Sequence, residues 1–141
     1  MNHIIIDIET IATQRNDVAA YIAATVKPPA TYKKPESIAA WHKEDGPQAI
    51  AEAVAKTGLD GAFGQVVCIG YDLHDKGEPD AIYGLDERDV LTRFNAALDT
   101  IPRAMHNATT VVGHNVSGFD LRFLWQRYVV NGIRPHAIIN A

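Results

Sequence analysis

Two carboxylates near the amino terminus are the first residues whose type and spacing could do chemistry. Asp7 and Glu9 follow the run Ile4-Ile5-Ile6, which is typical of a strand buried on both faces. Side chains two positions apart in a strand point to the same side, so these two carboxylates would lie together. A divalent cation with oxygen ligands is the simplest partner that offsets such a charge pair. The alternative is a chain that turns into solvent, for which Thr10 is suitable.

A third carboxylate occupies a comparable position later in the chain. The run 114–121, HNVSGFDL, follows a predicted strand, and Ser117 is a suitable helix N-cap. Asp120 stands three residues later, where a capping box carries its acidic partner. Phe123 and Leu124 place Asp120 on the inward face of the first turn, at the positive end of the helix. Asp120 therefore has a structural interpretation, as a capping residue, and a functional one, as a metal ligand.

The elements that must position these carboxylates follow from the hydrophobic pattern. Apolar runs and turn signals predict four strands and several helices in the order β, helical insertion at about 11–60, β, β, α, β, α. The predicted strands are near 4–8, 65–71, 80–85 and 109–113, and the last two helices begin at 86 or 89 and at 117. This order predicts an α/β fold with a mixed β-sheet flanked by helices. Ligands bind such sheets beyond the carboxyl ends of parallel strands, where both acidic motifs fall.

Composition limits the class of protein. The 141 residues suffice for a single domain, and 47% hydrophobic with 21% charged residues is ordinary for a soluble globular chain. The single cysteine, Cys68, excludes an internal disulfide and a cysteine-based zinc cluster. It lies in an apolar run, which predicts a buried, inert thiol in a reducing compartment. Neither a secretory signal nor an apolar run of membrane-spanning length is present, so we expect a cytoplasmic protein with no membrane partner.

The net charge argues against binding nucleic acid through phosphate contacts alone. The formal charge is −4, whereas proteins that grip the phosphate backbone are usually basic. Contact with nucleic acid would therefore use a local site in which metal ions offset the charge.

The two motifs together resemble the DEDD superfamily of 3′–5′ exonucleases, which has a ribonuclease-H-like fold. The residues that carry the resemblance are Asp7-x-Glu9-Thr10 at the end of one strand and Gly113-x-Asn115-x-x-x-Phe119-Asp120-Leu121 at the start of a helix. The run 113–133 is most similar to the exonuclease domain of family-B DNA polymerases and to stand-alone bacterial and phage relatives. The run 64–70 resembles the second strand of these proteins. The resemblance covers most of the chain and is weakest over residues 11–60.

The resemblance implies a site and a reaction. By position, Asp7 would bridge two Mg²⁺ or Mn²⁺ ions, Glu9 would bind the first and Asp120 the second, partly through water. The implied reaction is hydrolysis of the terminal phosphodiester of nucleic acid, at single-stranded 3′ ends, with release of a nucleoside monophosphate. Thr10 and Asn115 would contact the terminal nucleotide. Phe119 would stack on a base, or alternatively pack in the core.

The sequence departs from the family pattern at its third motif. The family carries a fourth carboxylate, an Asp in a later helix that follows a Tyr by four residues or a His by five. No Asp or Glu follows Asp120 here, since Tyr128 plus four is Gly132 and His136 plus five is Ala141. We therefore expect a C-terminally truncated member in which the final strand and helix of the fold are incomplete. The alternatives are a catalytically dead module that binds nucleic acid or a protein on the same fold, and an unrelated α/β protein whose carboxylates are structural.

Overall fold

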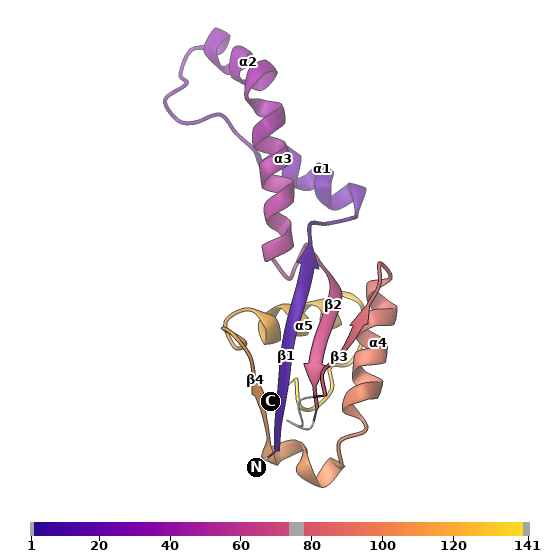
Figure 1. Cartoon of the computed structure of the whole chain (residues 1–141). Helices are drawn as coiled ribbons and strands as arrows, with labels where there is room; N and C mark the ends of the chain where they lie inside the picture. The colour runs from indigo at the N-terminus through magenta and orange to yellow at the C-terminus, as the bar shows by residue number, and fades with distance from the viewer. Residues whose placement is uncertain (1, 74–77, 140–141) are drawn as a thin grey trace. The chain divides into compact units, whose positions relative to one another are not determined.

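The computed structural model describes residues 2–73 and 78–139, and the chain divides into two compact units (Figure 1). Unit 1 combines Met1–Thr10 with Gln65–Ala141, and unit 2 is Ile11–Gly64. The helical insertion predicted at about 11–60 therefore corresponds to unit 2. Each unit is described by itself.

Unit 1 is built on a four-stranded mixed sheet. Its strands are β1 (Asn2–Ile11), β2 (Gln65–Asp72), β3 (Asp80–Tyr83) and β4 (Thr109–Val112), in the spatial order β3-β2-β1-β4. Strands β1 and β4 are parallel, with Asn2 opposite Thr109 and Ile5 opposite Val112. Strands β2 and β3 are antiparallel, and residues 74–77 between them lie outside the described chain. The predicted α/β class with a mixed sheet is confirmed, and the arrangement is consistent with a ribonuclease-H-like fold.

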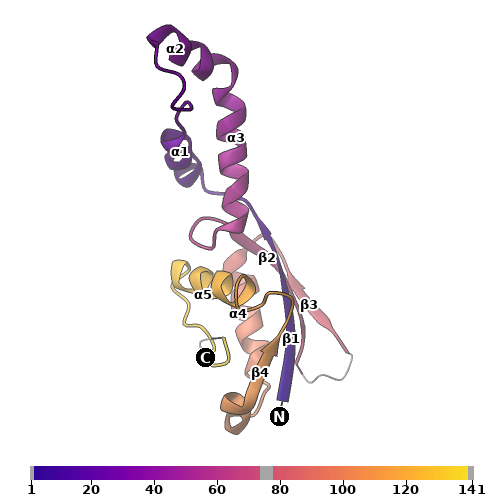
Figure 2. The ribbon, with the colours of Figure 1, turned by 90° about the vertical axis from the view of Figure 1, so that its left-hand side faces the viewer.

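The first strand is buried on one face, so the prediction of burial on both faces is wrong. Ile4, Ile6 and Ile8 are at most 7% exposed, whereas Ile5 is 41% exposed and Asp7 and Glu9 are also exposed. The alternation has period two because both described α-helices of unit 1 lie on the same side of the sheet (Figure 2). Three consecutive isoleucines fit either arrangement, and the one-sided helix layer decides between them.

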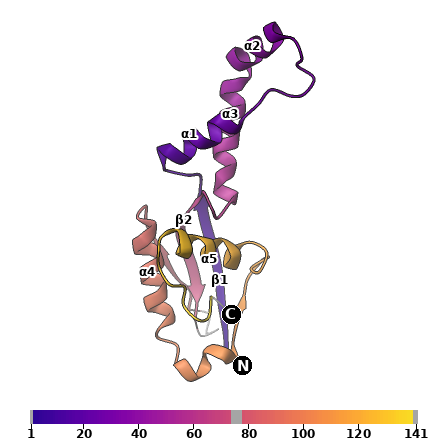
Figure 3. The same cartoon turned by 180° about the vertical axis from the view of Figure 1, so that it is seen from behind.

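Helices α4 (Glu87–Leu98) and α5 (Asp120–Val130) cover the buried face of the sheet (Figure 3). Their apolar residues recur at helical spacing and meet the inner isoleucines of β1. The Tyr128 hydroxyl donates to the Leu91 carbonyl oxygen at 3.2 Å, which satisfies the one polar atom of a fully buried ring. The helical core residues are Val90, Leu91, Phe94, Leu98, Phe123, Leu124 and Tyr128.

A buried ion pair ties the two helices to the sheet. The Glu87 carboxylate accepts from Arg127 Nε at 2.9 Å and from Arg127 Nη2 at 2.7 Å, with both side chains at most 8% exposed. The same carboxylate accepts from the Val66 backbone N–H and from Asn131 Nδ2, each at 2.7 Å. Four charge-assisted hydrogen bonds therefore fix the N-terminal end of α4, the C-terminal end of α5 and the start of β2 together. Sequence reasoning did not find this pair.

Two ends of the unit 1 helices follow the expected chemistry, and one does not. Asp86 caps α4 by accepting from the Asp89 backbone N–H at 3.2 Å. Helix α5 ends before Gly132, whose φ of +63° suits a glycine at a helix stop. The expected Ser117 cap is wrong, because residues 114–119 form turns and α5 begins at Asp120 with no side-chain cap. A short 3₁₀ helix, η2 (Arg103–Ala108), joins α4 to β4 and was not predicted.

Unit 2 consists of helices α1 (Asn16–Thr25), α2 (Pro35–Glu44) and α3 (Gly46–Lys56), followed by the 3₁₀ helix η1 (Thr57–Leu59). Helix α3 packs against both α1 and α2. Helix α2 begins at Pro35, in the first-turn position that proline favours. Trp41 is the one large apolar side chain that is buried in the unit, at 7% exposure.

Across residues 2–73 and 78–139, none of the helices combines the length and apolarity that crossing a bilayer requires.

Candidate functional site

Strand β1 presents two of the predicted carboxylates side by side. Asp7 and Glu9 are exposed on the face of the sheet opposite to Ile6 and Ile8, as their spacing predicts. Thr10 follows them and is partly buried. The strand therefore carries a pair of acidic side chains toward its carboxyl end.

Asp120 reaches the same strand from a position more than one hundred residues later. Its Oδ1 accepts a hydrogen bond from the Ile8 backbone N–H at 3.1 Å, and its side chain is only 4% exposed. The pairing of β1 with β4 ends at Ile5 and Val112, so the carboxylate takes the place of a strand partner for Ile8. This contact holds the first turn of α5 against the strand between Asp7 and Glu9.

The electrostatics of Asp120 are those of a buried carboxylate beside another one. Burial raises the pKa of the Asp120 carboxyl above its usual value, and the negative charge of Asp7 raises it further. Backbone N–H donors from Asp120 itself and from Ile8, together with the nearby His114, act in the opposite direction. Burial outweighs these donors, so the ionised form of Asp120 lacks a full counter-charge. A cation beside Asp7 and Asp120 would supply it.

The loop before α5 is built around two glycines and an asparagine. A Cβ on Gly113 would lie 2.6 Å from the Ile6 carbonyl oxygen, so only glycine allows the loop to approach β1 this closely. Asn115 adopts a φ of +50°, and its carbonyl oxygen accepts from the backbone N–H groups of Gly118 and Phe119, each at 2.9 Å. A Cβ on Gly118 would lie 2.4 Å from Asn115 Oδ1. Asn115 thus has a structural role in the turn, and its contact with a nucleotide stays a prediction.

Phe119 has one of the two roles that the sequence left open, which is core packing. Its side chain is partly buried and packs on the core, with its ring 5.4 Å from the ring of Phe123. The ring of Phe119 is not fully covered, and Phe119 immediately precedes Asp120 in the sequence. Core packing is therefore present, and base stacking stays a prediction.

Cys68 was predicted to be a buried, inert thiol, and the prediction of burial is wrong. The side chain is only partly buried, on β2. Burial raises the pKa of the Cys68 thiol most, and the charges of Glu9 and Asp7 raise it further. The thiol therefore lies near the carboxylate pair. Strand periodicity did not decide its orientation, since Val66 and Ile69 are both fully buried although they lie three positions apart.

The donor set suits a hard divalent cation. Asp7, Glu9 and Asp120 offer carboxylate oxygens, which Mg²⁺ and Mn²⁺ prefer, whereas the Cys68 thiol is a softer group. Within the described residues, no three acidic, histidine or cysteine side chains stand close enough to form a ready ligand set. The structure brings Asp120 to Asp7 and places Glu9 on the same face as Asp7. It does not place all three around one point.

Comparisons with protein-family models, with curated proteins and with solved structures give no significant match for this chain.

Proposed function

We propose that the chain is a metal-dependent nuclease domain of the 3′–5′ exonuclease type, acting on single-stranded nucleic acid. The observation that carries the proposal is the Ile8 N–H to Asp120 hydrogen bond, which brings the carboxylate of the second motif to the strand that carries the first. A capping role alone does not explain Asp120, because its side chain is buried next to another acid and lacks a full counter-charge. A carboxylate whose pKa is raised by burial beside another acid is a candidate for a functional group.

Under this proposal the three carboxylates are the metal ligands. Asp7, Glu9 and Asp120 would bind Mg²⁺ or Mn²⁺, and the ions would supply Lewis acidity to the scissile phosphate. Thr10 and Asn115 would contact the terminal nucleotide, and the exposed part of Phe119 would meet a base. The acidic surface needs the cations for a second reason, since the net charge of −4 would otherwise repel a polyanion.

A second candidate function is a module on the same fold that binds nucleic acid without cutting it. The observation in its favour is that these 141 residues contain three of the four acidic residues of the resembled family.

The decisive experiment combines metal binding with product analysis. The protein is titrated with Mn²⁺ while its melting temperature is followed, and 5′-labelled single-stranded DNA and RNA are then incubated with excess protein and Mn²⁺. We expect Mn²⁺ to raise the melting temperature of the wild type and to leave that of Asp7→Ala unchanged. Mononucleotide release from the 3′ end, however slow, that requires both Mn²⁺ and Asp7 supports the exonuclease.

The control is Glu44→Gln, which removes an exposed carboxylate of unit 2 and should behave as the wild type. Saturable, metal-dependent oligonucleotide binding without any release favours the binding module. A wild type whose melting temperature does not respond to Mn²⁺ contradicts both candidate functions.

A further inference from the structure

A pocket separate from the carboxylates lies at the opposite end of unit 1. It has a volume of about 480 Å³ and is lined by the end of α4, by η2 and by the segment that follows α5. Helix η2 leads into Thr109, which pairs with Asn2, so the pocket lies near the edge where β1 and β4 begin. Asp7 lies five residues after Asn2 on β1, so the two residues are roughly 16 Å apart at the usual rise per residue.

Hydrogen bonds to the backbone hold the walls of this pocket. Asn95 Nδ2 donates to the Arg134 carbonyl oxygen at 3.0 Å and ties the segment after α5 to α4. His106 Nε2 lies 2.9 Å from the Ile101 carbonyl oxygen, to which it must donate. His136 Nδ1 accepts from the Ile138 backbone N–H at 3.2 Å. The two imidazole rings meet edge to face, with centroids 4.7 Å apart.

The charge of the lining is positive within an acidic protein. Arg103 and Arg134 are exposed and line the pocket, and in the described part of the chain neither guanidinium has an ion pair or a hydrogen bond. The one carboxylate of the lining is Asp99, whose Oδ1 lies 3.4 Å from His136 Nε2. The lining therefore carries two permanent positive charges, on Arg103 and Arg134, and one negative charge. The negative charge is on Asp99, which already lies beside His136.

A metal ion does not suit this group of side chains. The Ile138 N–H occupies one ring nitrogen of His136, and the other points to Asp99. The protons that these contacts require leave neither nitrogen as a free lone-pair donor. The described residues also contain no trio of potential ligands close enough to share a cation.

We infer that this pocket binds a small phosphomonoester, with the phosphate held by Arg103 and Arg134. Guanidinium groups bind phosphate with paired, charge-assisted hydrogen bonds, and two of them balance a dianion. The volume falls in the range of small-molecule pockets, which leaves room for an organic group beside the phosphate. His106 and His136 provide ring edges for that group, and Pro135 and Ala137 provide an apolar wall. This site is independent of the proposed nuclease, since it shares no residue with the carboxylates of β1 and α5.

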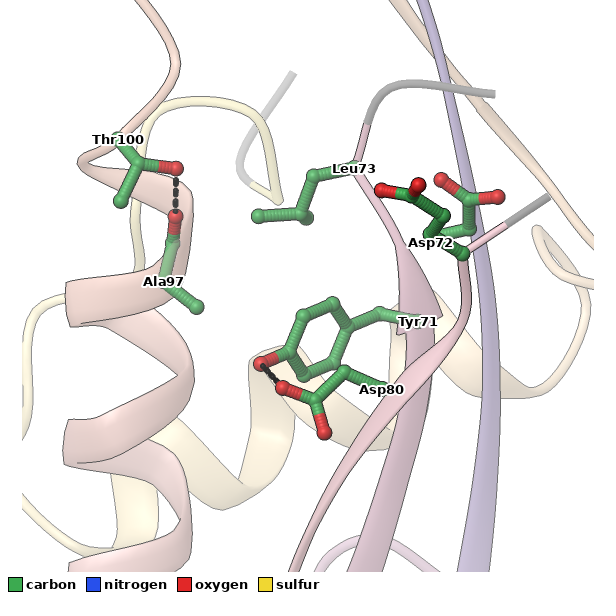
Figure 4. A pocket seen from close by; sticks show the side chains of 7 residues that line it. Tyr71, Asp72, Leu73, Asp80, Ala97 and Thr100 are labelled. Carbon is green, nitrogen blue, oxygen red and sulfur yellow. Dashed lines mark hydrogen bonds between the residues drawn. The ribbon is translucent and has the colours of Figure 1, made fainter. Parts of the chain in front are cut away.

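A second pocket of unit 1 has the opposite charge to the arginine-lined pocket. It has a volume of about 380 Å³ and lies between the β2–β3 hairpin and α4 (Figure 4). Its polar lining includes Asp72, Glu78 and Asp80, and Asp80 accepts from the Tyr71 hydroxyl at 3.2 Å. This acidic pocket would repel the anion that the arginine pocket attracts.

The test uses calorimetric titration of the whole chain with inorganic phosphate and with ribose 5-phosphate. A metal chelator at constant ionic strength removes any contribution from the carboxylates of β1. We expect saturable binding of both probes, with ribose 5-phosphate the tighter. The double variant Arg103→Ala/Arg134→Ala should lose affinity by about tenfold or more, as for the loss of hydrogen bonds to a charged group. The control Arg122→Ala removes an exposed arginine of α5 outside the pocket and should bind as the wild type.

Imidazole NMR signals locate the binding independently of affinity. Ribose 5-phosphate should shift the signals of His106 and His136 in the wild type and leave them in place in the double variant. No saturable binding of either probe overturns the proposal. So does binding of phosphate alone without ribose 5-phosphate, or an equal loss of affinity in Arg122→Ala.

Discussion

Asp120 is the residue at which the two interpretations, metal ligand and helix cap, can be distinguished by experiment. Its pKa is raised in the folded protein, so the ionised form destabilises the metal-free fold. This penalty is absent at a pH below the unfolded-state pKa of about 4, and it is fully present once the pH exceeds the raised pKa of the folded state. Asparagine keeps an oxygen for the Ile8 N–H and removes the charge.

We therefore predict that Asp120→Asn is at least as stable as the wild type at pH 7 without metal. Its advantage over the wild type should shrink as the pH falls toward 4, in urea unfolding curves measured across this range. Addition of Mn²⁺ should stabilise the wild type and not the variant. A variant that is less stable than the wild type at pH 7 and equally stabilised by Mn²⁺ would return Asp120 to a purely structural role.

A substitution at Phe119 tests whether the proposed site stacks on a nucleic acid base. Stacking on a base is worth about 1–3 kcal/mol, whereas a fully buried phenylalanine contributes about 3–5 kcal/mol to stability. Because the ring is only partly buried, we predict that Phe119→Ala lowers the affinity for a single-stranded oligonucleotide more than it lowers the free energy of unfolding. Fluorescence anisotropy and chemical denaturation measure the two quantities. Phe123→Ala, which truncates its fully buried neighbour, should show the reverse pattern.

At the scale of elements, the Glu87–Arg127 pair keeps α4, α5 and β2 in register. Arg127→Met keeps the aliphatic stem and leaves a buried carboxylate without its cation. Breaking a buried pair by removing one partner typically costs about 3–5 kcal/mol. We predict a loss of this size in the free energy of unfolding, measured with urea.

The chain offers a matched control for that substitution. Arg93→Met breaks the pair with Asp89, whose side chains are about half exposed, and exposed pairs contribute about 1 kcal/mol or less. Similar losses in the free energy of unfolding in the two variants would show that the buried Glu87 carboxylate does not need Arg127 for its stability.

At the scale of the whole molecule, the number of carboxylates would limit catalysis by the proposed nuclease. Two divalent cations in one site repel each other, and even two unit charges about 4 Å apart interact by about 4 kcal/mol near a protein surface. Each 1.36 kcal/mol of lost transition-state stabilisation is about a tenfold loss of rate. With three carboxylates we predict that the 141-residue chain releases nucleotides several decades more slowly than typical enzymes. A single-turnover assay with Mn²⁺ measures this, and ordinary enzymatic rates that disappear in Asp7→Ala would show that three carboxylates suffice.

The sequence predicted local features well, and it missed those that depend on distant partners. The shared face of Asp7 and Glu9 follows from strand geometry. The exposure of Ile5 depends on how many helix layers cover the sheet, which a run of isoleucines does not encode.

The missed interactions share a physical cause. Glu87 and Arg127 are forty positions apart and look like ordinary surface charges until α4 and α5 are packed together. The arginine pocket combines three segments, so no single motif marks it. The start of α5 at Asp120 depends on the turn that Asn115 stabilises, and Ser117 alone gave a misleading signal.

The division of unit 1 around unit 2 has a consequence for synthesis on the ribosome. Strand β1 leaves the ribosome before both of its neighbours in the sheet, because β2 and β4 lie after residues 11–64. At about 5–20 residues per second, β1 waits roughly 3–11 s before β2 begins to be made, and longer for β4. During this interval a strand with the run Ile4-Ile5-Ile6 has open edges on both sides, which is a hazard for aggregation. Asp7 and Glu9 place negative charge next to that run, so the carboxylates proposed to hold a cation in the folded protein would also keep the nascent strand from pairing with a wrong partner.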